Sequence, residues 1–439
     1  MMQYKSKKRG TKMNVAHFFL KLTNHKVDEH KFAGASPVAS GAFSGKDNDC
    51  FDLNFPEPTS VNAITLSEQG ERVTDFEIYV EKDGKLEMVY RQNRISEFRF
   101  CAIDEITTSK IRIKILKTRK GSFKNVCIYA YQLEKKKTSF RKMAYVVTSD
   151  CDKIDKNNLK YYNQFNIIGS IAMSADGRVY CKDNDFERML SILREHDKNA
   201  DVVVTMFADS SYVKTFKNKN TVKNIKEFLN KYALNGVSFD WEFPKSHFQW
   251  KLFDKFIVEL KKEIGDKRIT LALPSWLAYR FSSEALDCIE TAEVMTYDNM
   301  SRDIDGHHSE FFSDCANAVY HYVKKGFKLS QIDLGLPYYA RPVNGTAYWS
   351  DYRDEAEKLG WFSNVAEDEY QDVDVNKKPI TVKPRFYNSC QMIADKTAFC
   401  VHAGVGGIMV WSLGSDIEEN NDLCLSKLMS KTVSDRTEE

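Results

Sequence analysis

Short hydrophobic runs separated by turns dominate the chain between about residue 48 and residue 133. In one of them Ile111, Ile113 and Ile115 alternate with Arg112 and Lys114, a period of two that indicates a half-buried strand. Because no helical period lies between the runs, the pattern predicts an antiparallel β-sandwich over this part of the chain. The runs are Val61–Leu66, Phe76–Val80, Leu86–Tyr90, Phe98–Ala102, Ile111–Leu116 and Val126–Leu133.

The rhythm changes after the charged stretch from Glu134 to Lys142, which we take as a domain boundary. Eight buried apolar runs follow, and amphipathic segments with helical spacing, such as Val222, Ile225 and Leu229, separate them. The runs are Met143–Thr148, Phe165–Ile171, Val202–Phe207, Gly236–Glu242, Ile269–Pro274, Val294–Asp298, Ile332–Tyr338 and Gly407–Trp411. Eight strands that alternate with helices predict an α/β fold, a (β/α)8 TIM barrel over residues 143–430, preceded by the smaller sandwich.

One connection in the barrel, from about residue 341 to residue 387, is longer than such connections usually are. We expect it to be an insertion that walls one side of the barrel mouth, where catalytic groups of this fold lie. Tyr348 and Trp349 in this segment, and Trp276 after the fifth strand, either line the cleft or pack locally.

Charge and apolar content narrow the classes of partner. The formal net charge is +2, so we expect neither nucleic acid nor a membrane as a partner.

The apolar stretch from Val15 to Leu22 carries His17 and Lys21 and makes a poor secretion signal. We leave the compartment open between the cytoplasm and secretion with a signal absent from this sequence. The ten cysteines show no C-x-x-C spacing, which argues against a zinc site and against a disulfide scaffold. We expect no bound metal, no cofactor and a monomer.

The fourth barrel run ends in polar residues on one face. Ser238, Asp240 and Glu242 alternate with Phe239 and Trp241, so successive polar residues would lie about 6–7 Å apart in a strand. Neighbouring carboxylates raise each other's proton affinity, and one can stay protonated near neutral pH. This is what a general acid requires. The alternative is a structural acid pair that caps a helix or binds an arginine.

These residues resemble the signature D-G-x-D-x-D-x-E of the family 18 glycoside hydrolases, the chitinases and their endo-β-N-acetylglucosaminidase relatives. Three later strand ends resemble the same family in the same order. Met295–Asp298 is similar to M-x-Y-D, Gly335–Arg341 to G-x-P-x-Y-G-R, and Gly406–Ser412 to G-G-x-M-x-W-S. Four ordered matches over residues 143–430 make this resemblance specific.

The resemblance implies a substrate-assisted mechanism that retains the anomeric configuration. Glu242 would protonate the leaving oxygen while the acetamido oxygen of the sugar attacks the anomeric carbon, and water would then open the oxazolinium ion. Asp240 would accept a hydrogen bond from the acetamido N–H, and Tyr297 would contact the acetamido group from the other side. The substrate-binding residues that the resemblance implies are Trp411, as the floor of the subsite, with Asp298, Met295, Arg341, Tyr339 and Ser238.

The sequence departs from the family pattern at three places. Ser238 stands where the family has its inner aspartate, so the charge coupling to Asp240 is lost, although a hydrogen bond can remain. Asn235 replaces the leading aspartate, and the third strand, Val204–Asp209, lacks the sequence S-x-G-G. We expect these changes to affect rate and pH optimum more than the reaction.

Residues 15–134 resemble a discoidin (factor 5/8 type C)-like sandwich through Cys50–Phe55, Val61–Leu66 and Phe76–Val80. This implies a glycan-binding module that raises the local substrate concentration, and the alternative is a spacer. For the whole chain we expect a glycan that contains N-acetylglucosamine as the substrate. We expect an enzyme that hydrolyses β-1,4 bonds in chitin or chitooligosaccharides, and the alternatives are hydrolysis of N-glycan cores and binding without catalysis.

Overall fold

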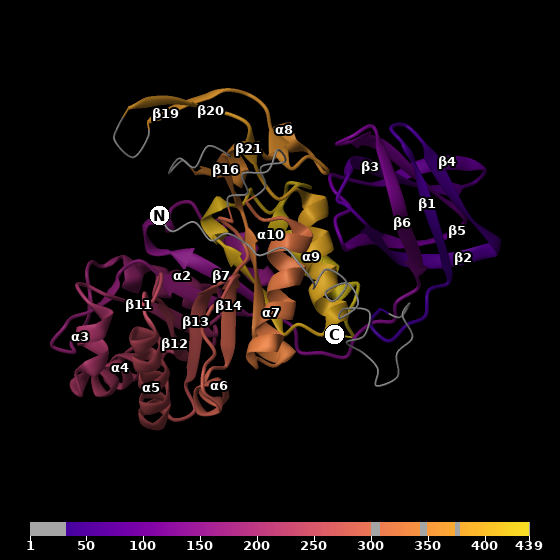
Figure 1. Ribbon diagram of the computed structural model, residues 1–439. Coiled ribbons are helices and arrows are strands. Elements are labelled where there is room, and N and C mark those ends of the chain that lie inside the picture. Colours follow the sequence, from indigo (N-terminus) through magenta and orange to yellow (C-terminus); the bar gives the residue numbers. More distant parts are fainter. Residues whose placement is uncertain (1–31, 300–307, 343–348, 374–377, 439) are drawn as a thin grey trace. The chain divides into compact units, whose positions relative to one another are not determined.

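The computed structural model describes residues 32–299, 308–342, 349–373 and 378–438 (Figure 1). The described residues divide into two compact units, one within residues 32–89 and 93–133, the other within residues 90–92 and 134–438. Within the described residues, no helix is both long enough and apolar enough to cross a membrane.

The first unit is an antiparallel sheet of six strands in the order β1-β6-β2-β5-β3-β4. The alternating isoleucines of β5 are buried, as their period of two predicts. Because β2 and β5 are long and contain register shifts, the strands join in one continuous sheet, in which bulges bend the strands. The strands are β1 (Ala39–Lys46), β2 (Cys50–Glu68), β3 (Val73–Lys82), β4 (Lys85–Gln92), β5 (Arg99–Thr118) and β6 (Ser122–Tyr131).

The second unit is a closed barrel of eight parallel strands, which confirms the predicted fold class. The pairing of β8 with β11 closes the circle. The short strand β9 (Ile171–Met173) pairs with the last residues of β11, and β10 (Val179–Cys181) pairs with β9. The barrel strands are β7 (Arg141–Val147), β8 (Gln164–Ile168), β11 (Val202–Ala208), β12 (Gly236–Asp240), β13 (Arg268–Pro274), β14 (Thr291–Met295), β15 (Ile332–Pro337) and β22 (Gly407–Trp411).

Helices cover the outside of the barrel, as Figure 1 shows for α4 and α5 below β11 and β12. The longest, α5, begins where the side chain of Ser246 accepts a hydrogen bond from the backbone of Gln249, and it ends at Gly265 with φ of 63°. The α-helices are α2 (Asp185–His196), α3 (Tyr212–Lys217), α4 (Asn220–Lys231), α5 (His247–Ile264), α6 (Ser283–Cys288), α7 (Asn317–Lys325), α8 (Ala356–Leu359), α9 (Cys390–Ala403) and α10 (Leu425–Ser434). The short 3-10 helices are η1 (Thr148–Asp150), η2 (Lys156–Tyr161), η4 (Leu329–Gln331), η5 (Tyr352–Asp354) and η6 (Leu413–Ser415). A short π-helix, η3 (Phe311–Ala316), precedes α7.

A buried ion pair ties the first barrel strand to the seventh. Arg141 on β7 donates from Nε to Oδ1 of Asp333 on β15 at 3.0 Å and from Nη2 to the same oxygen at 2.7 Å. The Asp333 side chain is fully buried, and Nη2 also donates to the carbonyl oxygen of Ser330 at 2.8 Å. The pair bridges β22, the strand that lies between β7 and β15 in the sheet.

The long connection between β15 and α9 forms a small sheet of its own, in the order β17-β16-β21-β18, together with the hairpin of β19 and β20. Tyr348 lies outside the described residues, whereas Trp349 lies within them. The strands are β16 (Tyr339–Pro342), β17 (Ser350–Asp351), β18 (Val365–Ala366), β19 (Tyr370–Val373), β20 (Pro379–Val382) and β21 (Arg385–Phe386).

Candidate active site

Alternate side chains of β12 face opposite sides of the barrel wall, with polar side chains inside and an aromatic side chain outside. Phe239 faces the helices and contacts Phe256 of α5 with ring centroids 5.6 Å apart, while Ser238 and Asp240 face the barrel interior. The hydroxyl of Tyr212 on α3 donates to the carbonyl oxygen of Asp240 at 2.7 Å. The strand ends at Asp240, two residues earlier than the predicted run, so Glu242 lies just beyond it. The end of the strand is therefore held by helix packing and by a hydrogen bond.

A cavity of about 400 Å³ opens at this end of the barrel. It combines carboxyl groups with aromatic rings, the mixture that is typical of a site for a small polar ligand. It contains most of the residues that the motifs single out. The lining residues are Asp240, Glu242, Phe243, Pro274, Ser275, Trp276, Met295, Tyr297, Asp298, Asn299, Tyr339, Trp349 and Trp411.

Asp240 and Glu242 form a carboxyl pair that holds a proton. Burial, followed by the charges of Glu242 and Glu293, raises the pKa of Asp240 to about 8. Burial and the charge of Asp298 also raise the pKa of Glu242, and a hydrogen bond joins Asp240 and Glu242. Because two carboxyl groups can hydrogen-bond only if one is protonated, the pair carries one proton near neutral pH. Oδ1 of Asp240 is buried without a hydrogen-bond partner, so it is an acceptor without a donor.

The pKa of Asp298 is shifted in the opposite direction, below its usual range. Burial alone would raise its pKa, but hydrogen bonds from Arg341, His308 and Tyr339 outweigh burial and hold the pKa well below its usual range. Arg341 donates from Nε to Oδ1 at 2.8 Å and from Nη2 to Oδ2 at 2.9 Å, and the hydroxyl of Tyr339 donates to Oδ1 at 2.8 Å. Asp298 is therefore a fixed anion in the wall of the cavity. Within the described residues, no three His, Cys, Asp or Glu side chains are grouped as metal ligands.

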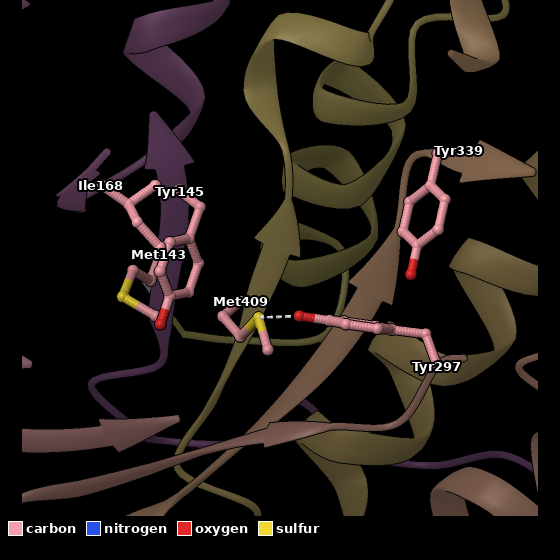
Figure 2. Packing of buried hydrophobic residues seen from close by; sticks show 6 residues of the cluster. All are labelled: Met143, Tyr145, Ile168, Tyr297, Tyr339 and Met409. Atoms are coloured by element: carbon pink, nitrogen blue, oxygen red, sulfur yellow. Dashed lines mark hydrogen bonds between the residues drawn. The ribbon is translucent and has the colours of Figure 1, made fainter. Parts of the chain in front are cut away.

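Tyr297 lies between the cavity and the apolar interior of the barrel. Figure 2 shows its hydroxyl directed at Met409, whose sulfur atom lies 3.7 Å away. A Cβ atom at Gly335 would lie 2.7 Å from a ring carbon of Tyr297, so the glycine on β15 leaves room for the ring. A weak acceptor such as sulfur leaves the Tyr297 hydroxyl available to a polar ligand.

Aromatic rings form two walls of the cavity. Trp411 at the end of β22 packs on Tyr145 with centroids 5.1 Å apart, and Trp349 lies 4.5 Å from Tyr339. On another wall Trp276, whose side chain is 56% exposed, contacts Phe243 at 5.3 Å. These broad, partly exposed faces suit the apolar faces of a ring-shaped ligand.

Ser238 does not line the cavity. It is fully buried, and its hydroxyl donates to Oε2 of Glu293 on β14 at 3.0 Å. Glu293 also accepts hydrogen bonds from Tyr145 on β7 and from Asn166 on β8, the latter at 3.3 Å. A buried polar layer thus lies beneath the carboxyl pair, and its central residue is Glu293.

The structure gathers the predicted residues in one place. Glu242, Asp240, Tyr297, Trp411, Asp298, Met295 and Tyr339 line the cavity. Arg341 reaches the cavity through its ion pair with Asp298, and Ser238 lies below. The motif analysis missed Glu293, which stands in the apolar run of β14, where a lone acidic residue was the available signal.

The chain is similar to several known proteins. The model of Glycosyl hydrolases family 18 matches residues 125–416. Chitotriosidase-1 of Mus musculus is 24% identical over 252 residues, which cover 46% of this chain and 54% of the mouse protein. The chain therefore spans about half the length of that relative.

Two solved structures share the fold. A chitinase from Bacteroides thetaiotaomicron matches with a TM-score of 0.55 and 20% identity over 69% of this chain and 99% of that one. A chitinase-like agglutinin from Robinia pseudoacacia matches with a TM-score of 0.53 and 14% identity over 67% of this chain and 99% of that one. The family match begins at residue 125 and so lends no support to the discoidin-like expectation, which stays a prediction.

Proposed function

Because the chain belongs to family 18 of the glycosyl hydrolases, we propose that it is a retaining glycoside hydrolase that cleaves β-1,4 bonds at N-acetylglucosamine in chitin or chitooligosaccharides. The observation that carries the proposal is the carboxyl pair of Asp240 and Glu242, which keeps a proton near neutral pH at the mouth of the barrel. Glu242, the more exposed member, delivers this proton to the leaving oxygen.

The other carboxylates of the cavity favour a substrate-assisted reaction. An ordinary retaining enzyme needs a nucleophilic carboxylate about 5–5.5 Å from the acid, across the sugar ring. Asp240 is hydrogen-bonded to Glu242 itself, and Asp298 is held by Arg341 and Tyr339. The nucleophile is therefore the acetamido oxygen of the substrate, with Oδ1 of Asp240 accepting the acetamido N–H and thereby gaining its missing partner.

The remaining residues bind and orient the sugar. Tyr297 turns its hydroxyl from the Met409 sulfur to the acetamido group, which is a stronger acceptor. Trp411 provides a flat face for the sugar whose bond is cleaved, and Trp276 provides one on the other side of that bond. The charged pair of Asp298 and Arg341 hydrogen-bonds to sugar hydroxyl groups.

A second substrate class is favoured by one observation. The insertion contributes Trp349 to the cavity wall, so the site is walled on that side, which suits the branched core of an N-glycan. Binding without catalysis is the third candidate, because the fold is shared with a chitinase-like agglutinin.

The test is release of 4-methylumbelliferone from the N,N′-diacetylchitobioside by the wild type and by Glu242→Gln. Loss of the general acid is expected to reduce the rate by about 10²–10⁴-fold. Glu284→Gln is the matched control, because that side chain is 66% exposed on α6 and should leave the rate unchanged.

Two further substrates separate the candidates. The cellobioside, which has a hydroxyl in place of the acetamido group, should not be cleaved if the substrate supplies the nucleophile. Release from an N-glycan but not from the chitobioside would select the N-glycan candidate. Binding of chitooligosaccharide without any release would overturn the enzyme proposal in favour of a lectin.

A further inference from the structure

The buried carboxyl group of Glu293 has no part in the reaction described so far. It lies on β14 inside the barrel with no exposed surface. Ser238 donates to Oε2 at 3.0 Å, the hydroxyl of Tyr145 donates to the same oxygen, and Nδ2 of Asn166 donates at 3.3–3.4 Å to both oxygens. Asn166 is in turn fixed by the hydroxyl of Thr205, which donates to its Oδ1 at 2.8 Å.

These contacts favour the ionised form of Glu293. Burial raises its pKa, but each of the neighbours Ser238, Tyr145 and Asn166 presents a donor, and hydrogen bonds to a carboxylate favour the charge. A buried carboxyl group that met acceptors would have to keep its proton. On balance the pKa of Glu293 is raised by burial, and the hydrogen bonds from these neighbours stabilise the carboxylate against that effect.

Glu293 lies at the same level of the barrel as Asp240, two strands away. Asp240, Ala272 and Glu293 are successive partners across β12, β13 and β14, and Ser238 precedes Asp240 on the same face. The charge of Glu293 adds to the causes that raise the pKa of Asp240.

The other charged groups near Glu293 leave this effect in place. Arg141 and Arg268 are the cations that face it, and Asp333 and Asp201 respectively already engage them. Asp333 adds a further negative charge nearby.

We propose that Glu293 is a positioning residue, which supplies from β14 a buried negative charge that keeps the catalytic proton on the pair of Asp240 and Glu242. The inference rests on the proposed hydrolase function. Ser238, the uncharged neighbour of the pair on β12, serves as the donor that orients this anion. The charge of Glu293 thus keeps the proton on the pair, although Glu293 itself does not contact the sugar.

The first experiment is the dependence of kcat/KM on pH with the chitobioside substrate. Glu293→Gln keeps the shape and removes the charge, so the alkaline limb of the profile should fall by about one pH unit. Ser238→Asp combined with Glu293→Gln moves the charge back beside Asp240 and should return the limb toward the wild-type pH. Thr205→Val, which loosens the same layer without removing charge, should lower the rate without moving the limb.

An unmoved limb in a folded Glu293→Gln variant would overturn the proposal. If that variant does not fold, the double variant decides, because a limb one unit below the wild type would contradict a role for the charge. A wild type without hydrolysis would instead reject the proposed function.

The second experiment does not depend on hydrolysis. Asp240→Asn is made in the wild type and in the Glu293→Gln background, and thermal unfolding is followed at pH 8. If Glu293 acts on Asp240 through charge, Asn should raise the melting temperature clearly in the wild type and much less without Glu293. Equal increases in both backgrounds would overturn the proposal.

Discussion

At the scale of single residues, the site separates two kinds of carboxyl group. Asp240 is buried beside like charges and holds a proton, whereas Asp298 is paired with Arg341 and stays ionised. The same chemical group thus serves as part of an acid in one place and as a fixed anion in the other.

This arrangement predicts a cost in stability at alkaline pH. The pKa of Asp240 is about 8 in the folded chain and 3.8 in an unfolded reference, so the folded state binds the proton more tightly. Its contribution to stability is complete below pH 3.8 and is lost as the pH rises through about 8. Asp240→Asn, which cannot lose a proton, should therefore raise the melting temperature at pH 8 and change it little at pH 4.

Thermal unfolding at the two pH values measures this effect. Asp287→Asn is the control, because its side chain is 75% exposed on α6. An equal increase in melting temperature from Asp240→Asn at pH 4 and pH 8 would show that the shape of the side chain, and not its charge, is responsible.

Sequence patterns located the cavity-lining residues but not the layer beneath them. Asp240, Glu242 and Tyr297 belong to linear motifs, so they could be found without coordinates. Glu293 and Ser238 are 55 positions apart and meet only when the barrel closes. A single acidic residue between Ala292 and Val294 shows no partner in the sequence.

At the scale of elements, aromatic packing on the outside of the barrel holds the end of β12. Phe216 on α3 stacks on Phe256 with centroids 4.0 Å apart and meets Phe239 edge-on at 5.7 Å. It also contacts Trp241 at 5.8 Å, so it touches both outward residues that flank Asp240.

Phe216→Ala should therefore destabilise the fold by about 3–5 kcal/mol, because it leaves a cavity between the helices and the strand. Urea denaturation measures this change. Phe248→Ala is the matched control, since Phe248 is 57% exposed on α5 and its loss should change the free energy of unfolding by no more than about 0.5 kcal/mol. Similar losses for both variants would contradict a specific role of Phe216.

The periodicity of the chain predicted a run at each of the eight barrel strands, although the run Val294–Asp298 lies three residues later than β14. The run from Phe165 to Ile171 divides into β8 and β9, because Gly169 adopts φ of 124° between them. Hydrophobic patterns report burial and not backbone direction, so such a break is visible only in the structure.

At the scale of the whole molecule, the barrel is closed by contacts between distant parts of the chain. Arg141 and Asp333 are separated by 192 positions and form a pair whose aspartate is fully buried. Arg141→Met removes one partner and leaves a buried charge, which should cost about 3–5 kcal/mol in the free energy of unfolding.

The control for this prediction is Arg188→Met. Arg188 forms a similar ion pair with Asp152, but both side chains are more than half exposed. The free energy of unfolding should therefore stay nearly unchanged. Chemical denaturation of the two variants compares them directly. A fold that tolerates Arg141→Met equally well would mean that the pair does not secure the closure.

The N-terminal unit shows where sequence reasoning ends. Predicted runs fall in β2 to β6 of the antiparallel sheet, whereas β1 matches no predicted run, and the runs Phe98–Ala102 and Ile111–Leu116 both fall in β5. Its binding function had no motif to support it, because a sheet of alternating residues serves as a lectin or as a spacer equally well. Glycan binding by this unit therefore stays a prediction.

The insertion between β15 and α9 has a consequence for how such a site can diversify. The acid pair lies at the end of β12, whereas Trp349 comes from the insertion. Insertions and deletions in this segment can therefore change one wall of the cavity, and with it the glycans that fit, without any change in β12 and its acid pair.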